Sequence, residues 1–143
     1  MPVLVNSISI GLLSDEVFDF CSDLQNEPKW NPDATSIERV TPGPLGVGTQ
    51  FRAKWRGSPP VLVEYLKFER PRIWETLGTA KGVDVGLRVE LAPQGESTRL
   101  TVTHDVRPKG LMRLLSPVFG RVFQKTAEKQ LANMKALLER SHD

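Results

Sequence analysis

Apolar residues recur at helical spacing over the last part of the chain, from Ser116 to Ser141. At about 100° per residue, the apolar side chains collect on one side of a helix and the charged ones fall elsewhere. The apolar side is formed by Phe119, Phe123, Ala127, Met134, Leu137 and Leu138. Ser116 suits the N-cap and Pro117 the first helical position. The pattern predicts one amphipathic helix of about 39 Å, at roughly 1.5 Å per residue.

The beginning of the chain predicts a strand followed by short helical segments. Leu4–Ile10 has alternating apolar positions that favour a strand. Ser14 is a candidate N-cap for a short helix over Ser14–Leu24, where apolar residues recur at helical spacing. Pro32 then closes what can be at most one further helical turn. We interpret Trp30, within that turn, as an anchor packed on the core rather than a ligand contact.

The middle of the chain changes to a period of two, which is typical of strands that are buried on one face. The predicted strands are Ser36–Thr41, Thr49–Arg56, Val61–Glu69, Ile73–Thr79, Val83–Leu91 and Thr98–Val106. Short turns between them, such as Pro93–Glu96, predict an antiparallel meander that is wet on one side and covered on the other. The long helix is the only element large enough to cover it. We therefore expect an α+β fold of about seven strands, in a single domain of residues 1–143, with the functional site between sheet and helix.

Polar residues on apolar faces are the candidates for chemistry. His104 lies between Val102 and Val106 on an inward face, and histidine can act as an acid or a base near neutral pH. Thr126 and Gln130 interrupt the apolar stripe of the long helix and could hydrogen-bond a carbonyl or hydroxyl group. An unpaired buried polar group costs about 1–3 kcal/mol, so we expect these three to bond one another, water or a ligand. A structural role for His104, paired with backbone or water, is the competing interpretation.

Aromatic and aliphatic side chains are candidate walls of a small-molecule cavity. The candidate ligand-binding set is Trp55, Tyr65, Trp74, Leu87, Val89, Val102, His104, Phe119, Phe123, Thr126 and Gln130. Ordinary core packing is the alternative for each aromatic residue. Because Val61–Glu69 alternates poorly, the directions of Tyr65 and Glu64 stay open. An inward Glu64 would be a carboxyl group of raised pKa and a candidate base for enolate chemistry.

Charge is distributed unevenly, although the formal net charge is only +2. Residues 1–38 hold seven acidic residues against one lysine, whereas residues 107–143 hold eight basic residues against three acidic ones. This asymmetry could guide an anionic partner or a membrane surface to the basic end; an ordinary solvated helix face is the alternative. Basic residues are not interleaved with aromatic ones in any strand, so nucleic-acid binding is not expected.

The residue inventory argues against several other classes of function. His104 and His142 are the only histidines, and no glycine loop for phosphate or nucleophile elbow is visible, so we expect neither a metal nor a cofactor. The one cysteine, Cys21, is predicted to be a buried thiol, which is consistent with a reducing compartment. We see no signal peptide and no apolar run near the ~18 residues of a membrane span, and we expect a cytoplasmic protein.

The order of elements and several short segments resemble the START/SRPBCC superfamily, in particular its bacterial polyketide cyclase/dehydrase and lipid-transport branch. The segments that carry the resemblance are Val17–Phe20 with Asp23-Leu24, Trp30–Pro32, Val47–Phe51, Glu69–Trp74 and Leu131–Glu139. The resemblance implies a helix-grip fold, in which a curved antiparallel sheet grips the C-terminal helix around a hydrophobic cavity. It implies no fixed catalytic set, since the superfamily holds lipid carriers, hormone receptors, cyclases and co-chaperone modules.

Three functions remain open at this point. The first is binding of a small hydrophobic ligand, such as a lipid, an isoprenoid or a polyketide-like molecule. The second is a polyketide cyclase or dehydratase activity with His104 as acid or base, and the third is a protein-interaction module. The expected partner is a small hydrophobic molecule, a transient membrane contact is a further option, and the chain is expected to be a monomer or a homodimer. Pro42–Gly48 and Arg107–Leu115 are predicted gates of the cavity.

Overall fold

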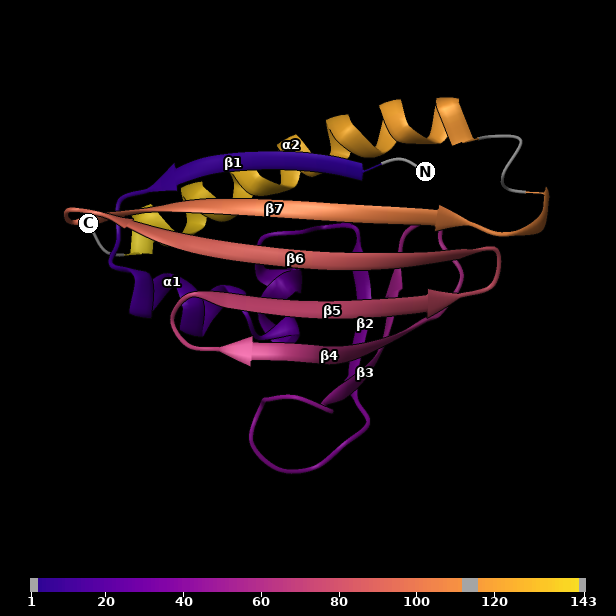
Figure 1. Cartoon of the computed structure of the whole chain (residues 1–143), viewed down its shortest axis with the longest axis horizontal. Helices are drawn as coiled ribbons and strands as arrows, with labels where there is room; N and C mark the ends of the chain where they lie inside the picture. Colours follow the sequence, from indigo (N-terminus) through magenta and orange to yellow (C-terminus); the bar gives the residue numbers. More distant parts are fainter. Residues whose placement is uncertain (1–2, 112–115, 142–143) are drawn as a thin grey trace.

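The computed structural model describes residues 3–111 and 116–141, and it describes side chains for residues 3–111 and 121–140. Seven antiparallel strands form one sheet in the order β1-β7-β6-β5-β4-β3-β2 (Figure 1). The strands are β1 Val3–Ile10, β2 Ala34–Arg39, β3 Gln50–Trp55, β4 Val61–Glu69, β5 Ile73–Ala80, β6 Val83–Gln94 and β7 Ser97–Pro108. The helices are α1 Ser14–Cys21, the 3₁₀ helix η1 Leu24–Lys29, and α2 Ser116–Ser141.

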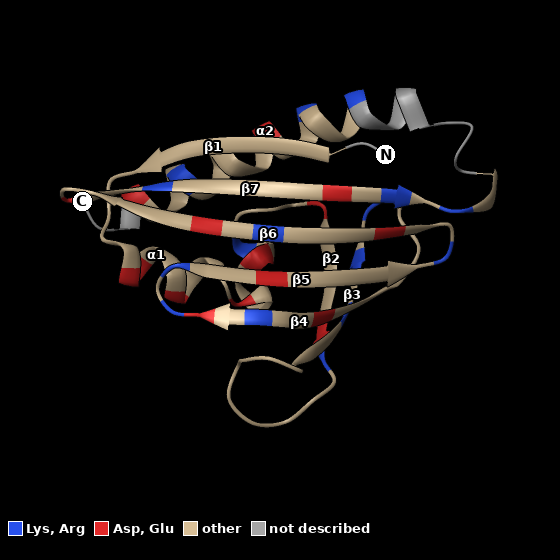
Figure 2. Ribbon diagram, viewed as in Figure 1, with Lys and Arg blue, Asp and Glu red and all other residues tan. Residues whose placement is uncertain are grey.

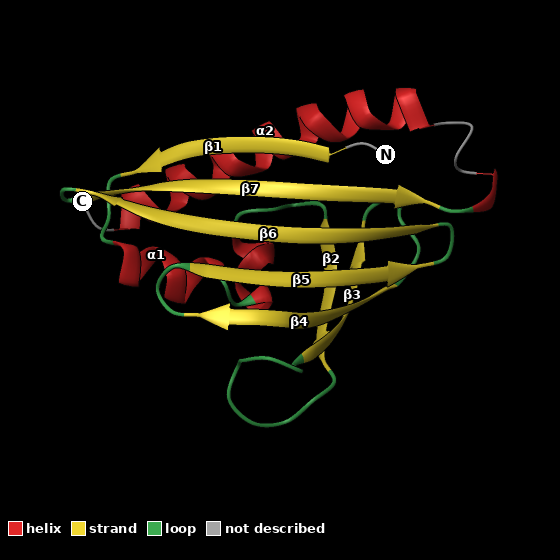
Figure 3. Cartoon of the chain, in the orientation of Figure 1, coloured by secondary structure: helices red, strands yellow, loops and turns green. Residues whose placement is uncertain are grey.

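The predicted α+β helix-grip fold is confirmed. In Figure 3, β1, β7, β6 and β5 pass in front of α2 and η1, whereas β2 and β3 lie farther back, so that the helices cover one face of the sheet. In Figure 1, β2 and β3 are turned steeply relative to β5, β6 and β7, which gives the sheet its curvature. Every strand from β2 to β7 pairs with its neighbour in sequence, while β1 pairs with β7 at the opposite edge. The chain therefore folds as a meander whose first strand joins last.

Two strands extend further than their sequence pattern predicts. The expected loop Pro93–Glu96 is wrong, because Pro93 pairs with Thr98 and Gln94 pairs with Ser97. Only Gly95 and Glu96 remain as the turn, and Gly95 has a positive φ of 62°. Glycine adopts this backbone conformation without the steric cost that other residues incur, which allows so tight a turn.

The poor alternation of β4 results from a β-bulge. Its register against β5 shifts between Tyr65 and Lys67. Val63 and Tyr65 are buried before the shift, and Phe68 packs against the core after it. Glu64 lies on the outer face, where its carboxylate accepts a hydrogen bond of 2.8 Å from the side chain of Gln50. The alternative of an inward Glu64 is therefore wrong.

The first helical segment is shorter than predicted. α1 ends at Cys21, and a separate 3₁₀ helix, η1, begins at Leu24 with the Asp23 carboxylate accepting from the N–H of Gln25. The N-cap of α1 is Leu13 and not Ser14. The Ser14 hydroxyl instead lies 3.0 Å from the Thr98 hydroxyl, so it ties α1 to β7.

α2 is attached to strand β1 by polar contacts as well as by its apolar side. Its buried residues are Ala127, Leu131, Met134 and Leu138. The Gln124 side chain donates to Asn6 Oδ1 at 2.6 Å, and Glu139 accepts from the N–H of Gly11 at 2.8 Å. Lys135 donates to the carbonyl of Ser9. The prediction that Ser116 is the N-cap and Pro117 the first helical residue involves side chains that the structure does not describe, so it stays a prediction.

The uneven charge of the sequence is partly neutralised within the fold. Figure 2 shows acidic residues on α1 and basic ones at the end of β7 and along α2. Arg70 forms a paired contact with Asp19 at 2.7 and 2.9 Å. At the basic end, Lys109 lies 2.9 Å from an Asp84 oxygen and Arg107 lies 2.7 Å from an Asp105 oxygen. Ion pairs within the chain therefore neutralise part of the acidic charge near the start of the sequence and part of the basic charge near its end.

Asn6→Ala tests the attachment of α2 to β1. Asn6 is buried and exchanges two hydrogen bonds with Gln124, so its truncation leaves that amide without partners on β1. We expect urea denaturation to show a loss of about 1–2 kcal/mol in the free energy of unfolding. The neighbouring exposed Ser7→Ala serves as the control and should change it by less than about 0.5 kcal/mol. Equal effects of the two variants would contradict the attachment.

Candidate ligand-binding cavity

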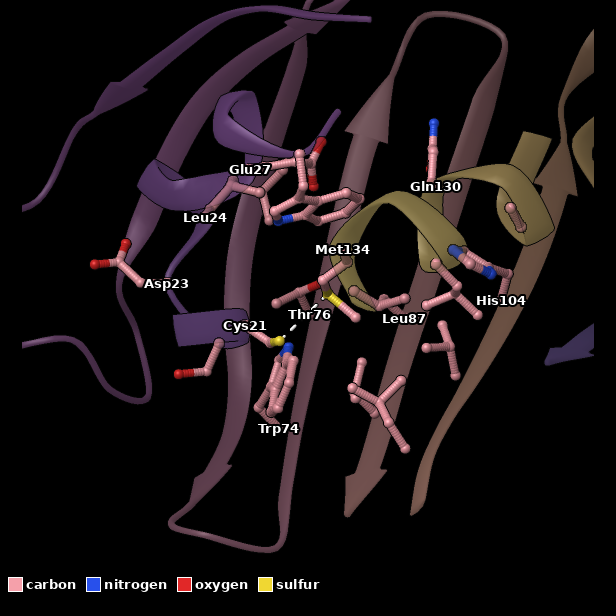
Figure 4. Close-up of a pocket in the computed structure, with 18 of the residues that line it drawn as sticks. Cys21, Asp23, Leu24, Glu27, Trp74, Thr76, Leu87, His104, Gln130 and Met134 are labelled. Carbon is pink, nitrogen blue, oxygen red and sulfur yellow. Dashed lines mark hydrogen bonds between the residues drawn. The ribbon is translucent and has the colours of Figure 1, made fainter. Parts of the chain in front are cut away.

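A cavity with two adjoining lobes lies between the sheet and the helices. The inner lobe has a volume of about 120 Å³ and the outer lobe about 320 Å³. Cys21, Trp74 and Met134 line the inner lobe (Figure 4). The outer lobe extends to the β3–β4 turn, where Arg56, Ser58 and Pro59 line it. Small-molecule sites commonly have volumes of about 300–1,000 Å³, so the outer lobe reaches that range by itself and the inner lobe does not.

The structure brings most of the predicted wall residues together around this cavity. Those that line the inner lobe alone are Tyr65, Trp74, Val89 and Val102. Those that line the outer lobe alone are Trp55, Phe123 and Thr126. Those that line both lobes are Leu87, His104 and Gln130. Phe119 lies outside the residues whose side chains are described.

His104 lies on the inward face of β7 and contacts Phe123 edge to face, with ring centroids 5.0 Å apart. Its Nδ1 is buried and has no hydrogen-bond partner among the described residues. A pairing with Thr126 is one of three options that the sequence leaves open, beside water and a ligand; the Thr126 hydroxyl donates instead to the carbonyl of Val122 at 3.0 Å. Burial lowers the pKa of His104 to about 4, so the ring is neutral at pH 7.

Glu27, which the sequence pattern did not single out, lines both lobes from η1. Its Oε2 accepts hydrogen bonds from the indole N–H of Trp55 and from Asn31 Nδ2. Burial raises the pKa of Glu27, and these two hydrogen bonds oppose the shift. Removal from water disfavours the charged form of a carboxyl group, so burial in the cavity wall shifts Glu27 toward its protonated form.

The 3₁₀ conformation of η1 explains why Glu27 was missed. At about three residues per turn, Leu24, Glu27 and Trp30 fall on one face of this helix. Leu24 and Glu27 line both lobes, and Trp30 lines the inner lobe while packing against the core. A spacing of three residues, with Pro28 inside the segment and Pro32 after it, is the signal that would have found Glu27. The sequence pattern over Leu24–Trp30 is interpreted as the end of one helix and one further turn, so it provides no candidate for the cavity wall.

Tyr65 connects η1 to the sheet in addition to lining the inner lobe. The side chain is only 2% exposed. Its hydroxyl donates to the carbonyl of Ser22 and accepts from the N–H of Leu24 at 3.2 Å. Burial raises the pKa of this phenol, which therefore stays protonated. Tyr65 thus fixes the start of η1, and with it the position of Glu27.

Cys21 faces the inner lobe as a half-buried thiol, in contact with the sulfur of Met134 at 3.2 Å. Burial raises the pKa of the thiol to about 12. Since the thiolate is the reactive form, Cys21 is suited to packing and not to nucleophilic chemistry.

The outer lobe reaches the surface near the β3–β4 turn. Asp33, Arg56, Ser58 and Pro59 line it there, and the side chains of Arg56 and Asp33 are 73% and 42% exposed. The gate predicted at Pro42–Gly48 is not supported, since none of its residues lines either lobe. Of the other predicted gate, residues 107–111 line neither lobe, and residues 112–115 lie outside the described part of the chain.

A curved antiparallel sheet that grips a C-terminal helix around an apolar cavity defines a START-like, helix-grip protein. The chain belongs to the polyketide cyclase/dehydrase and lipid transport family, whose sequence profile matches residues 1–139. Among curated proteins, none matches the chain significantly.

Solved structures share this fold over nearly the whole chain. Zhui aromatase/cyclase from Streptomyces sp. R1128 has a TM-score of 0.84 at 14% identity and covers 99% of this chain and 96% of its own. A protein from Thermus thermophilus has a TM-score of 0.81 at 17% identity, covering 99% and 100%. A START superfamily protein from Mycobacterium smegmatis has a TM-score of 0.73 at 20% identity, covering 97% and 95%. At these identities the likeness establishes the fold alone.

Membrane-spanning helices and metal-binding clusters are both absent from the described residues. Within residues 3–111 and 116–141, no helix is both long and apolar enough to span a membrane. The same residues contain no group of three or more His, Cys, Asp or Glu side chains placed to hold a metal ion.

An NMR titration tests the environment of His104. We expect its ring to titrate with a pKa of about 4, because burial penalises the imidazolium form. The chain has two histidines, so a His142→Gln variant leaves a single imidazole signal to follow. A ring that titrates near the unperturbed value of about 6.5 would show that His104 is solvated.

Tyr65→Phe tests the link between η1 and the sheet. The change removes one oxygen and leaves the Ser22 carbonyl and the Leu24 N–H without this partner. We expect a loss of about 1–3 kcal/mol in the free energy of unfolding, together with faster hydrogen exchange at Leu24. Thr79→Val, on an exposed position of β5, is the control and should leave both unchanged. Unaltered exchange at Leu24 would refute the anchoring role.

Proposed function

We propose that the protein, as a single domain of residues 1–143, binds a small hydrophobic molecule between the sheet and α2. The ligand would be a lipid, an isoprenoid or a polyketide-like compound. The observation that carries the proposal is the outer lobe of about 320 Å³, which opens toward the surface and continues into the apolar inner lobe. Protein interiors are otherwise close-packed, so an apolar space of this size is suited to a ligand. A hydrophobic ligand that enters it gains free energy because its apolar surface leaves water.

The candidate residues have distinct roles in this proposal. Trp74, Val89 and Val102 form the apolar wall of the inner lobe, while Trp55, Phe123 and Thr126 border the outer one. Leu87, His104 and Gln130 contact the ligand where it passes between the lobes. Tyr65 contributes its ring to the inner wall and holds η1 in place.

A cavity-filling variant tests the proposal. Val85 lines the outer lobe, whereas Leu62 lies exposed on the opposite face of the sheet. We expect Val85→Trp to weaken binding of the neutral fluorophore N-phenyl-naphthylamine by about tenfold or more, because the new indole occupies ligand space. Leu62→Trp adds the same side chain outside the cavity and should leave the affinity unchanged. Equal affinities in both variants would place binding outside the cavity.

Native mass spectrometry of the protein purified from its natural host provides an independent test. A co-purified lipid or polyketide that is lost in Val85→Trp and retained in Leu62→Trp supports the binding function. It would also identify the chemical class of the ligand.

A cyclase or dehydratase activity is the second candidate function. Glu27 and His104 line the cavity from different elements, η1 and β7; burial raises the pKa of Glu27 and lowers the pKa of His104 to about 4. A neutral Glu27 could protonate a leaving hydroxyl group while His104 removes a proton from the carbon next to a carbonyl, so that water is eliminated. A pKa of about 4 makes His104 a weak base, however, and this favours binding as the first candidate.

His104→Ala separates the two candidates. For an enzyme, we expect kcat on a bound hydroxyketone to fall by about a hundredfold or more, as is typical for loss of a general base. The dissociation constant should change by no more than about tenfold, the loss expected for one hydrogen bond. Absence of turnover in the unaltered protein would exclude the activity for that compound.

A further inference from the structure

The polar residues of the cavity are concentrated where its two lobes meet. Four polar side chains line both lobes: Glu27 from η1, Thr76 from β5, His104 from β7 and Gln130 from α2. We call these four residues the polar waist. Figure 4 shows Glu27 on one side of the cavity and His104 with Gln130 toward the other. Because four separate elements supply it, the polar waist is a property of the tertiary structure.

The polar waist has unused hydrogen-bonding capacity. His104 Nδ1 has no hydrogen-bond partner among the described residues. The Glu27 carboxyl group accepts the hydrogen bonds from Trp55 and Asn31 through Oε2. Buried polar groups are normally paired in folded proteins, so His104 Nδ1 is suited to meet a polar atom of a ligand.

The two lobes beyond the polar waist are mainly apolar. Trp74, Val89 and Met134 line the inner lobe, and Val61, Val85 and Phe123 line the outer one. This arrangement fits a molecule that has apolar parts on both sides of a polar group. The unequal volumes place the smaller apolar part in the inner lobe.

The charges around the cavity disfavour an anionic head group. Arg56 is the only cationic side chain that lines either lobe within the described residues, and it lies at the exposed rim near Asp33. The inner lobe is lined by two acidic residues, Asp23 and Glu27. A carboxylate drawn inside would lose its hydration without gaining a cationic partner.

We propose that the cavity selects a neutral molecule with a ketone or hydroxyl oxygen in its interior, and that the polar waist binds this oxygen. The selection rests on the binding function proposed above and specifies the class of ligand. Glu27 lines both lobes from η1, and burial raises the pKa of its carboxyl group toward the protonated form, which can donate to a ketone. Gln130 and Thr76 offer further donors from α2 and β5.

Isomeric ketones provide the test, because they differ in the position of the oxygen and hardly in hydrophobicity. The probes are undecan-2-one, undecan-4-one, undecan-6-one and undecanoic acid, each displacing N-phenyl-naphthylamine at pH 7. We expect an interior ketone to bind about tenfold more tightly than undecan-2-one, the advantage of one or two well-placed hydrogen bonds. Undecanoic acid should bind more weakly than the interior ketones.

Variants of the polar waist assign the preference to its residues. Thr76→Val and Gln130→Leu should each reduce the advantage of the interior ketone by about threefold to tenfold, with undecan-2-one bound as before. Thr79→Val, on the exposed face of the same strand as Thr76, is the matched control and should change neither affinity. Glu27→Gln keeps a donor at this position and should retain the preference, whereas Glu27→Leu should abolish it. Should Glu27→Leu fail to fold, Thr76→Val and Gln130→Leu decide the question.

The outcomes separate this inference from the binding function. Equal affinities for all three ketones, or tightest binding of undecanoic acid, would overturn the inference while leaving a hydrophobic binding function in place. A preference that survives in both Thr76→Val and Gln130→Leu would also overturn it. If neither the fluorophore nor any probe binds, the proposed function fails as well.

Discussion

The distance between α2 and the far side of the sheet determines everything that this protein can enclose. α2 is attached to β1 at one edge through Gln124, Lys135 and Glu139, which bond Asn6, Ser9 and Gly11. These contacts hold α2 over that edge and keep it from packing more closely against the concave face of the sheet. The sheet meanwhile bends away toward β2 and β3 (Figure 1). The space that remains is too large for the side chains that line it, and the result is a cavity rather than a closed core.

The sequence predicts the fold well because periodicity reports which face of an element is buried. The bounds of β4 and α2 agree with the pattern, and the inward face of β7, including His104, follows directly from alternation. Periodicity fails where the period itself changes. The bulge after Tyr65 brings Phe68 to the inner face of β4, opposite to the face of Glu64 before the bulge, and the three-residue period of η1 conceals Glu27. Both deviations depend on tertiary pairing, which one strand or turn cannot reveal alone.

The candidate site shows the same contrast between features that periodicity predicts and features that depend on the tertiary structure. The apolar wall residues could be predicted, since any inward residue near the helix is a candidate. The chemical character of the cavity could not, because it depends on which polar atoms stay unpaired after folding. Thr126 uses its hydroxyl on its own helix, whereas His104 keeps Nδ1 without a partner among the described residues. With a pKa of about 4, the neutral ring of His104 suits recognition of a polar but uncharged group better than proton transfer at neutral pH, which is why binding is the first interpretation.

The pairing of β1 has a consequence for how the protein is made. β1 is synthesised first, yet its sheet partner β7 and its helix partner α2 come from the other end of the chain. Contacts between positions so far apart in sequence form slowly, because a long loop must be closed before they contribute any stability. During translation β1 therefore lacks these two neighbours until β7 and α2 have been synthesised. The cavity should accordingly take shape late, and a ligand can be enclosed only after α2 has left the ribosome.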